Sequence, residues 1–265
     1  MRAIIIGAGS MGSWFARFLS KEGWEVDLLD VSHEKAVKAS EEVGGRAVSS
    51  PEGFYNLALI AVPISETPKA LLTYRHRAEV LVEIASVKGK VIKVVREEGI
   101  ENVLSIHPLF GPGLKDPRDG KAVLIPIHDA DKELRFAKSV FPFDFIVRDV
   151  STHDRVMAWL AISHGILNSL LAATEGMSEH LSEMSTTTVR GMLTLAGASL
   201  LQSPILTEEL VKENLFFQEE FNKFLKELTS FSEDPSKVIN KVRRWRNLLD
   251  TEKCYSALYR MLKEL

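Results

Sequence analysis

The sequence of 265 residues contains a single cysteine, Cys254. One cysteine cannot form an intramolecular disulfide, and the chain has no pair of cysteine ligands for a structural zinc ion. Such cysteine usage is typical of proteins of the reducing cytosol. We therefore expect a cytoplasmic protein without a metal site.

The sequence also lacks a block of charge of one sign, because its net charge of −3 is spread over mixed residues. A groove for nucleic acid or a basic surface for an anionic membrane is therefore not indicated. We expect no apolar run that approaches the length of a membrane span, and no secretory signal ahead of the first apolar run. Neither a nucleic acid nor a membrane is therefore expected as a partner.

Proline and glycine are scarce in the second half of the chain. Eight of the ten prolines and twelve of the sixteen glycines lie before residue 151. This shift predicts two domains, 1–150 and 151–265. We expect the first to be a Rossmann-type, doubly wound, mostly parallel sheet with strands at about 2–6, 25–29, 46–48, 57–62, 80–84, 103–106, 122–127 and 143–147. We expect the second to be all-helical, with helices at about 154–175, 179–201, 204–230, 235–250 and 252–264.

A glycine-rich turn joins the first expected strand to the first expected helix. It consists of Gly7, Gly9, Ser10, Met11 and Gly12, in the spacing Gly-x-Gly-x-x-Gly. The first glycine makes a tight turn, the second lets backbone N–H groups approach a pyrophosphate, and the third lets helix and strand pack closely. Asp30 closes the second strand, where its carboxylate accepts hydrogen bonds from ribose hydroxyls and repels a 2′-phosphate. The stretch predicts dinucleotide binding, with NAD preferred over NADP.

Two further strand ends carry candidate residues. Val62 and Pro63 close the fourth strand, and they either pass beside the nicotinamide ribose or simply end the strand. Ser86 follows the fifth strand, where it is either the N-cap of the next helix or a hydroxyl of the site.

His107 ends the strand at 103–106 and precedes a stretch rich in proline and glycine. Such a loop presents one imidazole at the sheet edge where ligands bind, so His107 is a candidate general base. The alternative is a histidine that only pins the loop. Both interpretations stay open on this stretch alone, while His107 and Ser86 together favour a site.

The expected helical domain offers three more candidates. His153 and His164 are eleven residues apart and share a helix face, but they are too far apart along the axis to hold one ligand atom. This spacing by itself favours a core stripe with two satisfied histidines. Arg190 stands among small and apolar residues, so it either pairs with an internal acid or awaits a carboxylate from outside.

Taken together, these residues resemble the prephenate dehydrogenase family of tyrosine biosynthesis. The resemblance rests on the glycine motif, Ser86-Val87-Lys88, His107-Pro108-Leu109-Phe110-Gly111-Pro112, the His153-Asp154 pair and Arg190. The match departs from the family at Ile84 and Ala85, where members commonly carry an acid and a threonine, and it is loose in the helical domain.

The resemblance implies an NAD-dependent oxidative decarboxylation of prephenate to 4-hydroxyphenylpyruvate. It implies that His107 is the general base, that Ser86 orients it, and that Arg190, His153 and His164 belong to the substrate side. It also implies a homodimer formed through the helical domain. The alternatives are an arogenate dehydrogenase, a β-hydroxyacid-type dehydrogenase, and a non-catalytic NAD-sensing regulator, which has no use for Ser86, His107 and Arg190.

Overall fold

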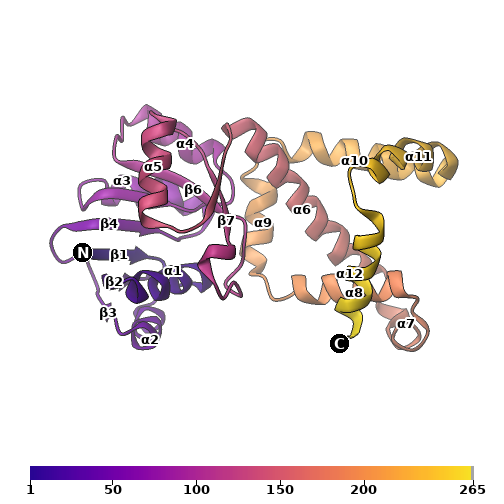
Figure 1. Cartoon of the computed structure of the whole chain (residues 1–265), viewed down its shortest axis with the longest axis horizontal. Helices are drawn as coiled ribbons and strands as arrows, with labels where there is room; N and C mark the ends of the chain where they lie inside the picture. The colour runs from indigo at the N-terminus through magenta and orange to yellow at the C-terminus, as the bar shows by residue number, and fades with distance from the viewer. Residues whose placement is uncertain (264–265) are drawn as a thin grey trace. The chain divides into compact units, whose positions relative to one another are not determined.

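The computed structural model describes residues 1–263 and divides into two compact units, Met1–Asp154 and Arg155–Leu265. The first unit contains an eight-stranded sheet, and the second is built from helices (Figure 1). This architecture confirms the expected fold class. The strands are β1 (Arg2–Ile6), β2 (Glu25–Leu29), β3 (Arg46–Ala47), β4 (Tyr55–Ile60), β5 (Ala78–Glu83), β6 (Val103–Pro108), β7 (Lys121–Leu124) and β8 (Asp144–Val147). The helices of the sheet unit are α1 (Ser10–Lys21), α2 (His33–Val43), α3 (Thr67–Tyr74), α4 (Gly89–Glu97) and α5 (Ala130–Val140), with 3-10 turns η1 (Ile64–Glu66) and η2 (Pro117–Asp119).

The strand order is β3-β2-β1-β4-β5-β6-β7-β8. Strands β3 to β6 are parallel, β7 runs antiparallel to β6, and β8 is parallel to β7. The order reverses direction between β1 and β4, and right-handed crossovers then put helices on both faces of the sheet. Ligands of such sheets bind at the carboxyl ends of the strands beside this reversal.

Two strand ends differ from the sequence expectation. Strand β4 ends at Ile60, before Val62 and Pro63. Strand β6 continues through His107 to Pro108 instead of ending at residue 106, because β7 pairs with its last three residues in antiparallel register. His107 is therefore the next-to-last residue of a longer strand, and the strand itself holds its backbone.

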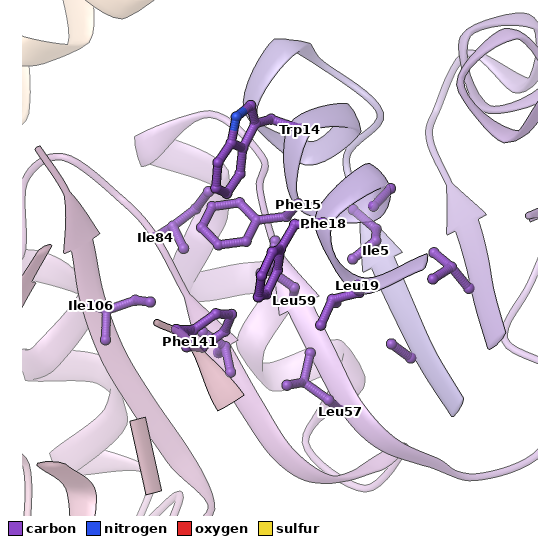
Figure 2. Packing of buried hydrophobic residues seen from close by; sticks show 14 of the residues in the cluster. Ile5, Trp14, Phe15, Phe18, Leu19, Leu57, Leu59, Ile84, Ile106 and Phe141 are labelled. Atoms are coloured by element: carbon purple, nitrogen blue, oxygen red, sulfur yellow. The ribbon is translucent and has the colours of Figure 1, made fainter. Parts of the chain in front are cut away.

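An aromatic cluster fixes helix α1 on the sheet (Figure 2). Trp14, Phe15 and Phe18 project from α1 and are almost fully buried, and Phe15 meets Phe141 edge to face with 5.7 Å between ring centroids. The Trp14 indole N–H donates to the Leu114 carbonyl over 2.9 Å. Large aromatic side chains bury more apolar area than any others. The cluster therefore holds the start of α1, and with it the glycine-rich turn, against the sheet.

The helical unit begins within α6 (Val150–Ala173), because the first turn of this helix still belongs to the sheet unit. It contains 3-10 turns η3 (Glu175–Met177) and η4 (Arg243–Asn247) and helices α7 (Ser178–Met184), α8 (Thr187–Ser199), α9 (Pro204–Lys212), α10 (Phe217–Glu233), α11 (Pro235–Val242) and α12 (Thr251–Lys263). The helices expected at 179–201 and 204–230 are each split in two. Ser185 and Thr186 take extended conformations that break the first. Residue 264 of the last expected helix lies outside the described residues.

Helix α6 corrects one expectation about apolar runs. It is 24 residues long and contains an 18-residue window with a mean hydropathy of 1.5, so among residues 1–263 one helix is long and apolar enough to cross a membrane by length and composition. Its first turn, however, carries the buried His153 and Asp154, which are hydrogen-bonded within the sheet unit. Core helices of globular proteins meet the same length and composition test.

Candidate functional site

The glycine-rich turn has the geometry that a dinucleotide needs. Gly7 has a φ of +101°, and a Cβ placed there would overlap the Ala61 carbonyl oxygen, while a Cβ at Gly12 would overlap the Gly7 carbonyl oxygen. A Cβ at Gly9 would meet no atom within 4 Å. Gly7 and Gly12 are therefore required for close packing, whereas Gly9 leaves open space in front of helix α1.

The amino end of α1 suits an anion. Gly9 is its N-cap without a side-chain cap, and the first turn, which holds Ser10 and Met11, has no acidic residue. Uncapped N–H groups and the positive end of the helix dipole both favour phosphate. Ser10 is exposed and Met11 is half-buried, so this turn is open to a ligand.

Asp30 is held in place at the end of β2. One carboxylate oxygen accepts the Ala8 N–H over 2.7 Å, and the other accepts the Ser32 N–H over 2.8 Å. A carboxylate has about four acceptor positions, so two remain for ribose hydroxyls. The residues of this edge thus fit a dinucleotide with an unphosphorylated ribose.

Val62 and Pro63 follow β4 on the other side of the reversal. The preceding Ala61 carbonyl lies against Gly7, which places the residues after β4 beside the glycine-rich turn. Pro63 does not end the strand, since β4 already ends at Ile60, and it serves instead as the N-cap of η1. The purely strand-ending interpretation of Pro63 is therefore wrong.

The side chain of His107 is joined to two other residues in a chain of hydrogen bonds. His107 Nδ1 lies 2.9 Å from His153 Nε2, and His153 Nδ1 lies 2.8 Å from an Asp154 carboxylate oxygen. The two rings meet edge to face, with centroids 5.1 Å apart. All three residues are buried. The sequence pointed to His153 as a cleft residue, and the geometry makes it the direct support of His107.

This chain fixes the tautomers by inference from the hydrogen-bond network. The Asp154 carboxylate is an acceptor, so His153 Nδ1 carries a hydrogen and donates it. Neutral His153 then has a lone pair at Nε2, which accepts from His107 Nδ1–H. His107 Nε2 is left with its lone pair, and in residues 1–263 no hydrogen bond occupies it. Every fully enclosed polar side-chain atom of the described residues has a hydrogen-bond partner. Since His107 Nε2 has no such partner, it is not fully enclosed.

Asp154 is in turn anchored to the start of helix α4. Its carboxylate accepts the Lys88 N–H over 2.9 Å and the Gly89 N–H over 2.8 Å. A carboxylate at a helix amino end is stabilised by the free N–H groups and by the dipole. The orientation of His107 is therefore set by the backbone of the β5–α4 connection through two side chains.

Burial depresses the basicity of His107. Its pKa lies well below 6.5, first because burial penalises the imidazolium, then because His153 and the Lys88 ammonium repel a second positive charge. His107 is therefore neutral at physiological pH. A neutral imidazole with a free Nε2 is the form that accepts a proton.

A second buried cluster lies beneath His107, and the sequence did not reveal it. Lys88 Nζ donates to a Glu83 carboxylate oxygen over 2.7 Å and to the Ile106 carbonyl over 2.7 Å, and Ser105 Oγ donates to Glu83 as well. Lys88, Glu83 and Ser105 are all fully buried. The Lys88 side chain is therefore closed to solvent. The available signal was a polar residue next to apolar ones in each of two strands, Glu83 at the end of β5 and Ser105 within β6.

The remaining candidates stand as follows. Ser86 is half-buried between β5 and α4, and its interpretation as the N-cap of α4 is wrong, because Lys88 occupies that position. His164 is buried on α6, where burial lowers its pKa. Arg190 is exposed on α8, so the premise of a buried guanidinium is wrong. Within the described residues no group of three or more His, Cys, Asp or Glu side chains is arranged to hold a metal ion.

The sequence and the fold are similar to those of known proteins. Residues 15–139 match the family model of the prephenate dehydrogenase nucleotide-binding domain. A probable arogenate/prephenate dehydrogenase of Methanocaldococcus jannaschii is 25% identical over 252 residues, which cover 87% of this chain and 56% of that protein. A probable prephenate dehydrogenase of Streptomyces niveus is 30% identical over 190 residues, covering 64% of this chain and 51% of the relative. The chain thus spans about half the length of these curated relatives.

Among solved structures, the prephenate dehydrogenase of Aquifex aeolicus, crystallised with hydroxyphenyl propionate and NAD⁺, superposes with a TM-score of 0.68 at 19% identity. The match covers 93% of this chain and 96% of that one, and it shows a shared fold. Fold and site together define a protein with a Rossmann-type nucleotide-binding unit followed by a helical unit. The nucleotide-binding unit is similar to that of the prephenate dehydrogenase family over residues 15–139.

Proposed function

We propose that the protein is an NAD-dependent prephenate dehydrogenase, which converts prephenate to 4-hydroxyphenylpyruvate and CO2. The observation that carries the proposal is the neutral His107, whose Nε2 is free while its Nδ1 is held by His153. Asp30 and the open space at Gly9 support NAD as the cofactor. The single, exposed Cys254 suits a cytoplasmic enzyme.

The proposed reaction transfers a hydride and a proton, and then breaks a C–C bond. Bound NAD supplies the acceptor for the hydride that leaves the carbinol carbon of prephenate. His107 Nε2 takes the hydroxyl proton as the carbonyl develops, which is general-base catalysis. The C–C bond to the ring carboxylate then breaks, CO2 departs, and the electron pair of that bond makes the ring aromatic and leaves its oxygen as a phenolate, which takes the proton back from His107 Nε2. The driving force lies in the substrate, so the protein contributes position and charge.

Three residues are assigned to the substrate side, and His153 supports the base. Ser86, at the strand end next to the β5–α4 connection, hydrogen-bonds the reacting hydroxyl, and His153 orients His107 from behind. Arg190, whose guanidinium is exposed on α8, grips a carboxylate with its two-pronged geometry. His164 belongs to the substrate side of the helical unit.

Arogenate is the second candidate substrate, since it differs from prephenate by an amine on the side chain and the archaeal relative is named for both activities. The β-hydroxyacid and regulator alternatives lose weight, because neither uses a base at the end of β6. A β-hydroxyacid-type dehydrogenase would instead use a lysine base in the helical domain.

We also propose a homodimer formed through the helical unit. In residues 1–263, all but four of the exposed large apolar side chains lie beyond Asp154. Exposed apolar surface on this scale marks an interaction site. Light scattering that returns the monomer mass of 29.6 kDa at micromolar concentration would contradict the dimer.

The deciding experiment follows NADH absorbance after mixing the protein with prephenate and NAD, with arogenate and with NADP in parallel. We expect rapid NADH formation with prephenate and NAD. Turnover with arogenate alone would move the proposal to the second substrate. Silence with both, despite measurable NAD binding, would contradict the proposal and return His107 to a structural role.

A further inference from the structure

The second polar cluster of the sheet unit, Glu83, Lys88 and Ser105, has no part in the chemistry described above. It is a fully buried ion pair with a buried hydroxyl. The Glu83 carboxylate accepts from Lys88 Nζ, from Ser105 Oγ and from the Ala85 N–H, the last over 2.9 Å. Buried ion pairs contribute little net stability, because desolvation offsets the Coulomb gain. Net stability therefore does not explain why this ion pair is buried here.

The explanation lies where strand β5 ends. Strands β5 and β6 pair only as far as Glu83 and Ser105, whereas β6 continues to Pro108 beside β7. The Ser105 carbonyl points toward β7, where it accepts the Ile125 N–H over 3.0 Å. Carbonyls alternate along a strand, so the Ile106 carbonyl points to the side that β5 has left. An unpaired buried carbonyl there would cost roughly 1–3 kcal/mol.

Lys88 fills this position with its side chain. Its ammonium donates to the Ile106 carbonyl over 2.7 Å, while Glu83 holds the ammonium from the other side. The Ile106 carbonyl belongs to the peptide that leads into His107. The ammonium thus replaces the missing strand at the residue where the base is attached.

The backbone of the same residue supports His107 by a second route. The Lys88 N–H donates to Asp154, which holds His153, which holds the ring of His107. Lys88 therefore supports the main chain of His107 through its ammonium group, and the ring of His107 through its backbone N–H. The positive charge of Lys88 also opposes protonation of His107.

We propose that Lys88, held by Glu83 and Ser105, is a positioning residue for His107 that fixes the end of β6 and, through Asp154 and His153, the orientation of the imidazole. This inference rests on the proposed function for its kinetic consequences only. The geometry on which it stands is independent of the substrate.

The test replaces the ion pair as a unit. Lys88→Met alone would leave a buried carboxylate unpaired, so the main variant is Glu83→Gln with Lys88→Met. Lys93→Met is the matched control, because Lys93 is an exposed lysine of the same helix. We expect the double variant to lose about 100-fold in kcat, with KM values within about threefold, since ground-state contacts stay while the base is misplaced. The control is expected to match the wild type.

The second readout needs no substrate. The pKa of the His107 imidazole is followed by NMR, with His107→Asn to assign the signal. We expect it to rise by about one unit in the double variant, because Lys88 is the member of the ion pair whose charge lowers the His107 pKa. If kcat and this pKa both stay at wild-type values and only the melting temperature falls, the pair is structural and the inference is wrong. If the wild type shows no turnover but the pKa moves as expected, the proposed function fails and the inference on Lys88 stands.

A milder variant covers the case in which the double variant does not fold. Ser105→Ala removes one donor from Glu83 and keeps the ion pair. We expect a loss of about threefold in kcat and a smaller pKa shift in the same direction. Wild-type values of kcat and pKa for Ser105→Ala would then overturn the inference.

Discussion

The two units of the molecule differ most in how many large apolar side chains they leave exposed. The sheet unit buries charged residues and joins them to one another, as in Asp154, Glu83 and Lys88. The helical unit leaves large apolar residues exposed, among them Leu201, Leu215 and Leu248. Buried, fully hydrogen-bonded polar groups hold a fixed geometry, whereas exposed apolar faces need a partner. We therefore expect changes in the sheet unit to alter turnover, and changes in the helical unit to alter substrate affinity or association.

The largest effect is expected from His107→Asn. Removing a general base lowers kcat by about 10²–10⁴, and we expect a value near 10³. NAD affinity should be unchanged, because the glycine-rich turn lies at another strand end. Stopped-flow NADH formation and an NAD titration measure the two quantities. His76→Asn, on the surface of the same unit, is the control, and retained turnover in His107→Asn would remove it from the base role.

Asp154→Asn is expected to cost about 100-fold in kcat with NAD affinity intact. An amide in this position no longer sets His153 Nδ1 as the donor, so the tautomer of His107 is no longer fixed. Two-dimensional ¹⁵N NMR of the imidazoles reads the tautomers directly. An unaltered His107 tautomer together with unaltered kcat would show that Asp154 serves only the fold.

Gly9→Ala and Gly12→Ala separate cofactor binding from packing in the same turn. A methyl group at Gly9 enters open space, so we expect a melting temperature within a few degrees of wild type and NAD affinity reduced about tenfold. At Gly12 the methyl group overlaps the Gly7 carbonyl, and we expect a large loss of stability. Thermal unfolding with and without NAD tests both. Equal stability of the two variants would contradict this division of roles.

Acid should weaken the sheet unit through His107. Its pKa is depressed in the folded state, so below the unfolded value of about 6.5 the unfolded chain binds a proton that the folded chain refuses. The free energy of unfolding therefore falls with decreasing pH, by up to about 1.4 kcal/mol per unit from this residue. Urea titrations at pH 7 and 5.5 measure the slope. His107→Asn should reduce it, and an identical slope would assign the acid sensitivity to other groups.

Arg190→Gln is expected to have the smallest effect. Arg190 is exposed, so we expect no change in melting temperature and a rise of about fivefold in the KM for prephenate at constant kcat. Steady-state kinetics with either substrate check this. An unchanged KM would place the carboxylate grip on another residue.

Much of the sheet unit follows from local patterns. Apolar runs of strand length, punctuated by glycine and proline, predicted the strands within a few residues, and the spacing of Gly7, Gly9 and Gly12 predicted the turn. The helical unit was harder, because its amphipathic pattern continues across Ser185 and Thr186, where the backbone leaves the helix. Periodicity records which face is apolar and is insensitive to such short breaks.

By itself the sequence determined the doubly wound sheet, the dinucleotide turn and His107 as the candidate base, because each depends on residues close together in the chain. Only the tertiary structure decided that His107 lies within a strand, that His153 and Asp154 fix its tautomer, and that Lys88 is buried under it. These contacts join β5, β6 and the start of α6, which are far apart in sequence. Hydrogen bonds between distant segments depend on strand register and on where one strand outlasts its neighbour, and neither is written in local composition.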